Sequence, residues 1–171
     1  TSGVVATPIH SYRPNPEGKL QMFCGTTPAT WTAIGCTLAA AGSYHWFCQA
    51  LGTYELLRQQ QEGVDAYILL DEQARAAPAG CGGLLYFPYL MGERCPLFDA
   101  DARGAFWGID STMGKGHFAR AVLEGVAYSL RQVYDLTRSP DVGAPEYIVV
   151  CGGGSKSGLW RQILADVFQL P

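Results

Sequence analysis

The segment from Pro88 to Gly108 constrains the fold of this 171-residue chain more than any other part of its sequence. It begins PYLMGERCP and continues through Asp99 to the run DARG, so turn-forming residues, charges and glycines alternate closely. This alternation interrupts the periodicity of both an amphipathic helix and a strand. We therefore expect an ordered loop over Pro88 to Asp101, preceded by a short strand over Leu84 to Phe87 and followed by another over Ala105 to Ile109.

The sequence before this block predicts strands followed by helices. Thr1 to Ile9 and Leu20 to Thr26 have strand-like patterns, and the Pro/Asn/Gly-rich turn over Arg13 to Gly18 predicts that they form an antiparallel hairpin. A helix rich in small residues is expected over Trp31 to Leu51. A second helix is expected over Thr53 to Gln61, with Thr53 as its cap.

The second half of the chain gives the clearest helix signal. Asp71 to Gly83 is expected to be a loop or frayed helix, whereas Gly116 to Arg138 has an apolar face with i, i+3, i+4, i+7 spacing. The β-branched run Tyr147 to Cys151 suits a buried strand, and Ser157 to Gln169 suits a helix. Because no repeat or linker divides the chain, we expect one α/β domain over residues 1–171. The apolar face of the long helix comprises Phe118, Ala121, Val122, Val126, Ser129, Leu130 and Val133.

Composition and charge argue against several classes of protein. The net charge of −3 and the pI near 5.5 argue against a nucleic-acid partner. No apolar stretch approaches the roughly 20 residues that span a bilayer, so no membrane partner is expected. The six cysteines show neither a CxxC pair nor metal-ligand spacing with histidine, and most lie in apolar runs. We therefore expect reduced, mostly buried thiols, no metal site and a cytoplasmic protein.

Two glycine-containing turns are candidate phosphate-binding sites. The run Gly152 to Gly154 lies between an expected strand and an expected helix, where glycine permits a positive φ and the helix N-terminus offers free N–H groups. The run has neither the GxxxxGK[ST] spacing nor the GxGxxG fingerprint, because residue 157 is serine. A tight turn that binds no ligand is the alternative. The run Thr1 to Gly3 offers hydroxyl and N–H groups to a phosphate, or else it simply begins a strand.

Five segments, in order along the chain, resemble the C-terminal domain of the FGGY family of carbohydrate kinases in its xylulokinase-like form. They are the end of a phosphate-contacting turn at Thr1 to Val5, a small-residue helix at Ala39 to Phe47, the block from Leu85 to Gly104, a helix segment at Ala119 to Tyr128, and an adenosine-binding turn at Gly152 to Ser157. The resemblance implies an actin-like, ribonuclease-H-like α/β fold with a mixed sheet and flanking helices. It also implies that the chain is most of this domain, cut at both ends, without the N-terminal sugar-binding domain.

The same resemblance implies a nucleotide site. In such kinases this domain holds most of the ATP, the other domain holds the sugar, and Mg²⁺ offsets the charge of the phosphates. The base aspartate is expected upstream, so we expect no catalytic residue here and an inactive isolated chain. The positions that would contact ATP or ADP are Thr1, Ser2, Gly3, Ala41, His45, Gly152, Gly153, Gly154 and Ser157.

The charges of the central block have two interpretations. Glu93 and Arg94 could act as an acid and a guanidinium clamp, but we favour local pairing of both charges to hold an irregular loop. Asp99, Asp101 and Arg103 are expected to belong to the same brace.

Several functions are compatible with these features. The first is a kinase that phosphorylates a ketose, D-xylulose above others, to give D-xylulose 5-phosphate. A gluconate kinase shares the Gly-Glu-Arg-x-Pro block, and a glycerol kinase ranks lower. A non-catalytic actin-like nucleotide sensor or scaffold is an alternative of another class, and a dimerisation module is a third. A homodimer is compatible with all of them.

Overall fold

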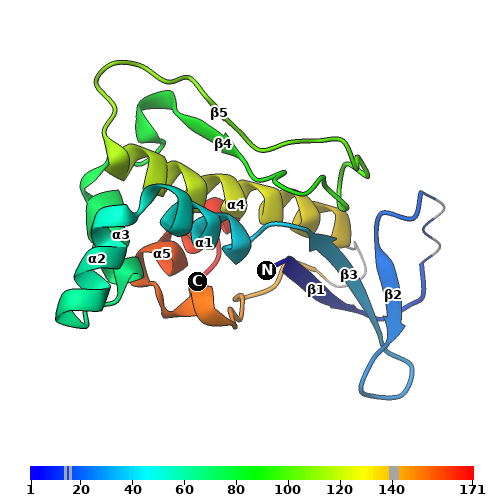
Figure 1. Cartoon of the computed structure of the whole chain (residues 1–171). Coiled ribbons are helices and arrows are strands. Elements are labelled where there is room, and N and C mark those ends of the chain that lie inside the picture. Colours follow the sequence, from blue (N-terminus) through cyan, green and yellow to red (C-terminus); the bar gives the residue numbers. More distant parts are fainter. Residues whose placement is uncertain (14, 16, 139–142) are drawn as a thin grey trace.

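One long helix, α4 (Lys115–Thr137), lies at the centre of the fold (Figure 1). The computed structural model describes residues 1–13, 15, 17–138 and 143–171. Helices α1, α3 and α5 and strands β1, β3 and β4 all contact α4. Residues 121–127 of this helix are therefore buried throughout rather than on one face. The helix predicted over Gly116 to Arg138 is confirmed, and its predicted apolar face is at least partly buried along its whole length.

Three antiparallel strands form the sheet at the N-terminal end of the chain (Figure 1). They are β1 (Gly3–Ile9), β2 (Gln21–Cys24) and β3 (Trp31–Thr37), in the order β1-β3-β2. The predicted hairpin of the first two strands is wrong, because both of them pair with β3 instead of with each other. Two residues of the turn predicted over Arg13 to Gly18, at positions 14 and 16, lie outside the described residues.

The helix predicted over Trp31 to Leu51 begins ten residues later than expected, because β3 occupies its first part and α1 runs over Ala41–Leu51. Small residues at this strand serve close packing rather than helix formation. A Cβ built at Gly35 would lie 2.3 Å from Cγ1 of Val133, so the strand can lie against α4 only if residue 35 lacks a side chain.

Two further helices follow α1. Helix α2 (Thr53–Glu62) confirms the second predicted helix, but its N-cap is Gly52 and Thr53 makes no capping bond. Helix α3 (Ala66–Ala76) replaces the loop or frayed helix expected from Asp71 onward. Its N-cap is Asp65, whose side chain accepts a hydrogen bond from the Tyr67 N–H, and the helix packs against α4.

The central block forms an irregular loop, as predicted, between the short antiparallel strands β4 (Leu85–Phe87) and β5 (Ala105–Trp107). Tyr86 and Phe106 face the core, whereas their neighbours Leu85 and Trp107 are exposed on the outer side of this two-stranded sheet. The 3₁₀ turn η1 (Cys81–Gly83) precedes β4.

The buried strand predicted over Tyr147 to Cys151 is not formed. The segment pairs with no strand in the part of the chain that the structure describes. Its side chains alternate as a strand would, since Ile148 and Val150 pack on the core while Tyr147 and Val149 are 64% and 79% exposed. The 3₁₀ turn η2 (Gly153–Lys156) and helix α5 (Gly158–Phe168) follow, and α5 confirms the last predicted helix.

All six cysteines are free thiols, as expected. Cys48, Cys81 and Cys95 are buried, whereas Cys24 and Cys151 are exposed. Among the described residues, no helix combines the length and the apolarity that crossing a membrane requires.

Candidate functional site

The first residues of the chain lie against the start of α1. The backbone N–H of Gly42 donates a hydrogen bond of 3.1 Å to the carbonyl of Thr1, and a Cβ built at Gly42 would lie 2.4 Å from the Thr1 nitrogen. Gly3 is equally close to the connection before the helix, because a Cβ there would lie 2.6 Å from the Cβ of Ala40. Two of the predicted groups, Thr1 to Gly3 and the small-residue helix, therefore form one continuous surface.

Helix α1 presents an N-terminus that favours an anion. Its N-cap, Ala40, makes no side-chain capping bond, and its first turn contains no acidic residue. Ala41 and His45 are four residues apart and so lie on the same side of the helix. Nδ1 of His45 lies 2.7 Å from the hydroxyl of Tyr67 on α3, and the imidazole is exposed. This hydrogen bond restricts the orientation of the exposed His45 imidazole.

The glycine turn before α5 is open to solvent. Gly152 has φ of 89°, a conformation that favours glycine, and Gly152 and Gly153 are both exposed. No atom lies within 4 Å of a Cβ built at Gly153. Ser157 caps α5 by accepting a hydrogen bond of 3.0 Å from the Trp160 N–H, which leaves its own hydroxyl hydrogen unused by that bond. The first turn of α5 contains no acidic residue.

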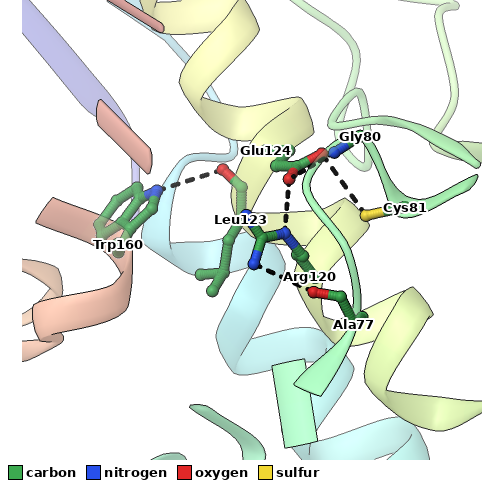
Figure 2. Close-up of polar contacts among 7 residues, drawn as sticks. All are labelled: Ala77, Gly80, Cys81, Arg120, Leu123, Glu124 and Trp160. Carbon is green, nitrogen blue, oxygen red and sulfur yellow. Dashed lines mark hydrogen bonds and ion pairs between the residues drawn. The ribbon is translucent and has the colours of Figure 1, made fainter. Parts of the chain in front are cut away.

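Trp160 anchors this turn to the central helix. A Cβ built at Gly154 would lie only 1.9 Å from the Trp160 ring, so the turn rests directly on the indole. Figure 2 shows the other side of this contact, where the indole Nε1 donates a hydrogen bond of 3.2 Å to the carbonyl of Leu123 on α4. The position of the glycine turn is thus set by packing against α4 and not by the turn alone.

A buried carboxylate holds the loop on the far side of α4 (Figure 2). Glu124 accepts hydrogen bonds from Arg120 Nε at 2.7 Å, from the Gly80 N–H at 3.1 Å and from the Cys81 thiol at 3.4 Å. Burial, together with the charge of Glu124, raises the pKa of Cys81 to about 12. The thiol is therefore protonated at neutral pH and acts as a donor to the carboxylate, not as a nucleophile.

The charged brace of the central block forms in part as predicted. Oδ1 of Asp99 accepts the N–H groups of Asp101 and Ala102 at 2.8 and 3.1 Å, and the Arg103 guanidinium donates to two carbonyls of the same turn. Glu93 binds the backbone N–H of Arg94 at 2.7 Å, and no ion pair joins their side chains among the described residues. Local pairing of both charges was therefore the wrong explanation for Glu93.

The structure thus brings Thr1, Ser2, Gly3, Ala41 and His45 to one end of α1 and leaves Gly152, Gly153, Gly154 and Ser157 in a second group before α5. In the view of Figure 1, the N-terminus and η2 both lie below α4.

A hollow of about 490 Å³ lies at the other end of α5, lined by Gln162, Ala165, Asp166, Gln169, Leu170 and Pro171. The described residues contain no group of three or more His, Cys, Asp or Glu side chains placed to bind a metal.

Sequence reasoning missed two residues of this surface. Gly42 is the residue that Thr1 contacts, and the AAAGS run that contains it was the available signal. Tyr67, the partner of His45, could not be found from the sequence, because the helix that carries it was not predicted and the contact joins residues 22 apart.

The helices, the small sheets and the two glycine-containing turns belong to one α/β fold, and comparison with known proteins identifies its family. Residues 1–171 match the family described as "FGGY family of carbohydrate kinases, C-terminal domain". The chain therefore belongs to the FGGY family of carbohydrate kinases, whose members have the actin-like ATPase fold.

Individual relatives agree with this assignment. The xylulose kinase of Bacillus subtilis (strain 168) is 36% identical over 169 residues, which are 98% of this chain and 32% of that protein. The gluconokinase of the same strain is 35% identical over 171 residues, which are 99% of this chain and 33% of that protein. The crystal structure of xylulose kinase from Rhodospirillum rubrum superposes with a TM-score of 0.82 at 29% identity, covering 99% of this chain and 32% of that one. The chain thus spans about a third of the length of these relatives.

Proposed function

We propose that the protein containing this chain is an ATP-dependent sugar kinase and that this chain is its nucleotide-binding part. The observation that carries the proposal is the match of residues 1–171 to the C-terminal domain of the FGGY kinases. Two features of the candidate site support it: Thr1, Ser2, Gly152 and Gly153 are exposed, and the first turns of α1 and α5 contain no acidic residue.

The residues have distinct roles in this proposal. Thr1, Ser2 and Gly3, with Ala41 and His45, contact the phosphates of ATP, where hydroxyl, N–H and imidazole groups can donate to oxygen. The exposed turn at Gly152 to Gly154, with Ser157, contacts the adenosine. Because Gly153 has no side chain and no neighbour above it, the backbone there is accessible to a flat ring or a ribose.

No group of three or more metal-ligating side chains occurs among the described residues, so Mg²⁺ remains an expectation from the family and no role is assigned to it in this chain. The base that deprotonates the sugar hydroxyl and the residues that hold the sugar are expected outside these residues. We accordingly propose that the isolated chain binds nucleotide weakly and does not transfer phosphate.

D-Xylulose is the proposed substrate, with D-xylulose 5-phosphate as the product. The similarity of the chain to xylulose kinases supports it. Gluconate is the second candidate, because the Bacillus gluconokinase is 35% identical to the chain. A homodimer and a cytoplasmic location are further expectations of the same proposal.

The proposal is tested by measuring ADP release from Mg-ATP by the full-length protein with D-xylulose, L-ribulose, gluconate or glycerol. We expect turnover with D-xylulose and a kcat/KM at least about 100-fold higher than with the other three compounds, a range that hydrogen-bond recognition of hydroxyl groups can provide. Preferential turnover of gluconate would replace the substrate and keep the enzyme class. Tight ADP binding without turnover of any compound would favour the sensor or scaffold.

A further inference from the structure

Glu93, in the loop between β4 and β5, is a buried carboxylate, and its hydrogen-bond donors among the described residues are all uncharged. It is 3% exposed. Its Oε2 accepts a hydrogen bond of 2.5 Å from the hydroxyl of Thr37, and its Oε1 accepts the N–H groups of Leu38 at 3.0 Å and of Arg94 at 2.7 Å. Hydrogen bonds to an ionised carboxylate are short and strong, and burial strengthens them further.

Two of these donors come from the connection that leads into α1. Thr37 is the last residue of β3, and Leu38 begins the short link to Ala41, where the helix starts. The carboxylate therefore fixes the direction in which the chain leaves the sheet and enters the helix. The backbone of Glu93 is itself fixed, because its N–H and C=O exchange hydrogen bonds of 2.7 and 2.9 Å with Asp99.

The same connection supports the first residues of the chain. Gly3 pairs with Thr37 in the sheet, and a Cβ built at Gly3 would lie 3.2 Å from Cγ2 of Thr37 and 2.6 Å from the Cβ of Ala40. The Thr1 carbonyl then accepts the N–H of Gly42 in the first turn of α1. An unbroken set of contacts thus runs from Glu93 through Thr37 and Leu38 to the surface that Thr1 to Gly3 and α1 form together.

We propose that Glu93 is a positioning residue for the nucleotide, acting through Thr37 and Leu38 on the phosphate-binding end of the site. The proposal rests on the function proposed above and deepens it. Glu93 touches neither ATP nor sugar; it sets the distance and angle between the N-terminal turn and the helix. A displacement of about 1 Å in the groups that position a substrate can lower the rate about 100-fold, even when the mutation lies far from the reacting atoms.

The test compares Glu93→Gln with Glu124→Gln in the full-length protein. Both carboxylates are nearly fully buried, at 3% and 5% exposure, but Glu124 supports the η1 loop and has no hydrogen bond to β3, α1 or the N-terminal turn. In Glu93→Gln the amide nitrogen cannot accept the Thr37 hydroxyl. We expect this variant to raise the KM for ATP about tenfold and leave the KM for sugar within about twofold, whereas Glu124→Gln leaves both within about twofold while lowering the unfolding midpoint.

A second pair of variants tests the proposal should Glu93→Gln fail to fold. Thr37→Val removes the hydroxyl while keeping the side-chain shape, and Thr37→Ser keeps the hydroxyl. We expect Thr37→Val to raise the KM for ATP about fivefold and Thr37→Ser to restore it to the wild-type value. If both carboxylate variants change the KM for ATP equally, or if Thr37→Val leaves it unchanged, Glu93 is only structural and the proposal is overturned. A wild-type protein that binds no ATP would overturn the proposed function as well.

Discussion

Glu55 of α2 and Lys115, the first residue of α4, form an ion pair of 2.6 Å in which the carboxylate is only 1% exposed. Gln73 of α3 donates a second hydrogen bond of 2.6 Å to the same carboxylate, so one buried group connects three helices. Burial alone would raise the pKa of Glu55, but the hydrogen bonds from Lys115 and Gln73 outweigh it and hold the pKa below 4.5. Helices α2, α3 and α4 all contact α1, which carries Ala41 and His45 of the candidate site.

Lys115→Met should destabilise the protein substantially, because it leaves the Glu55 charge buried with only Gln73 as a side-chain partner. We expect a loss of about 2–4 kcal/mol in the free energy of unfolding, somewhat less than for a fully buried pair since Lys115 is 32% exposed. Lys19→Met is the control, because Lys19 pairs with an exposed Glu17 and its loss should destabilise the protein far less. Urea denaturation of both variants measures the difference, and equal losses would contradict a special role for Glu55.

The same pair predicts a pH dependence of stability. The pKa of Glu55 is lower in the folded state, so its stabilising contribution is full above the unfolded pKa near 4.5 and is lost as the pH falls through the folded value. The difference in unfolding free energy between the wild type and Glu55→Gln should therefore be largest at pH 7 and shrink below pH 4.5. A difference that stays constant from pH 7 to the acid transition would contradict the assigned cause.

Gly42→Ala should disturb the contact between α1 and the N-terminal turn. The added Cβ would lie 2.4 Å from the Thr1 nitrogen, so Thr1 must move away and the Gly42 hydrogen bond must lengthen. We expect ADP affinity to fall about tenfold, as a small displacement of positioning groups would cause. Gly114→Ala is the matched control, since no atom lies within 4 Å of its Cβ. Calorimetric titration with ADP measures both, and an unchanged affinity in Gly42→Ala would separate this contact from nucleotide binding.

Gly153→Val should block the glycine turn without damaging the fold. The new side chain meets no protein atom within 4 Å at its Cβ, so the free energy of unfolding should change by less than about 1 kcal/mol. A bound adenosine would occupy that space, and we expect ADP affinity to fall at least about tenfold. Thermal unfolding and ADP titration together distinguish the two effects. Normal ADP binding by Gly153→Val would place the adenosine elsewhere.

The thiol of Cys81 should react more slowly with alkylating reagents than the thiols of Cys24 and Cys151. It is fully buried and its pKa is raised to about 12, whereas Cys24 and Cys151 are exposed. Iodoacetamide followed by peptide mass mapping should label Cys24 and Cys151 first and Cys81 only in urea. Rapid labelling of Cys81 in the native protein would contradict its hydrogen bond to Glu124.

The sequence predicted the central block, α2, α4 and α5 because their patterns are local. It failed at β3, where Ala33, Gly35 and Cys36 were assigned to a helix, although their burial alternates with a period of two. Small residues fit either structure, and only packing against Val133 decides between them. It also missed α3, although Asp65 and the spacing of Ala66, Leu70 and Ala74 are typical of a capped amphipathic helix.

The candidate site was predictable as a set of positions but not as a surface. The resemblance to a family supplied Thr1, Ala41 and Gly153, whereas the contact of Thr1 with Gly42 depends on how β1 and α1 meet in space. The role of Glu93 is of the same kind, because its partners Thr37 and Leu38 lie more than 50 residues away. A charged residue in an irregular loop suggests pairing with a neighbouring charge, and nothing local indicates a hydroxyl and a backbone N–H from a distant strand end as its partners.

Amide hydrogen exchange of the protein with and without ADP tests whether the residues at the start of α1 and the glycine turn before α5 form one nucleotide site. We predict that ADP slows exchange in the peptides that cover Ala41 to His45 and Gly152 to Ser157, while the peptide around Met22 on the outer strand β2 is unchanged. Protection at both groups would establish that they form one nucleotide site. If saturating ADP leaves both groups unprotected, or protects only other segments, these residues do not form the nucleotide site.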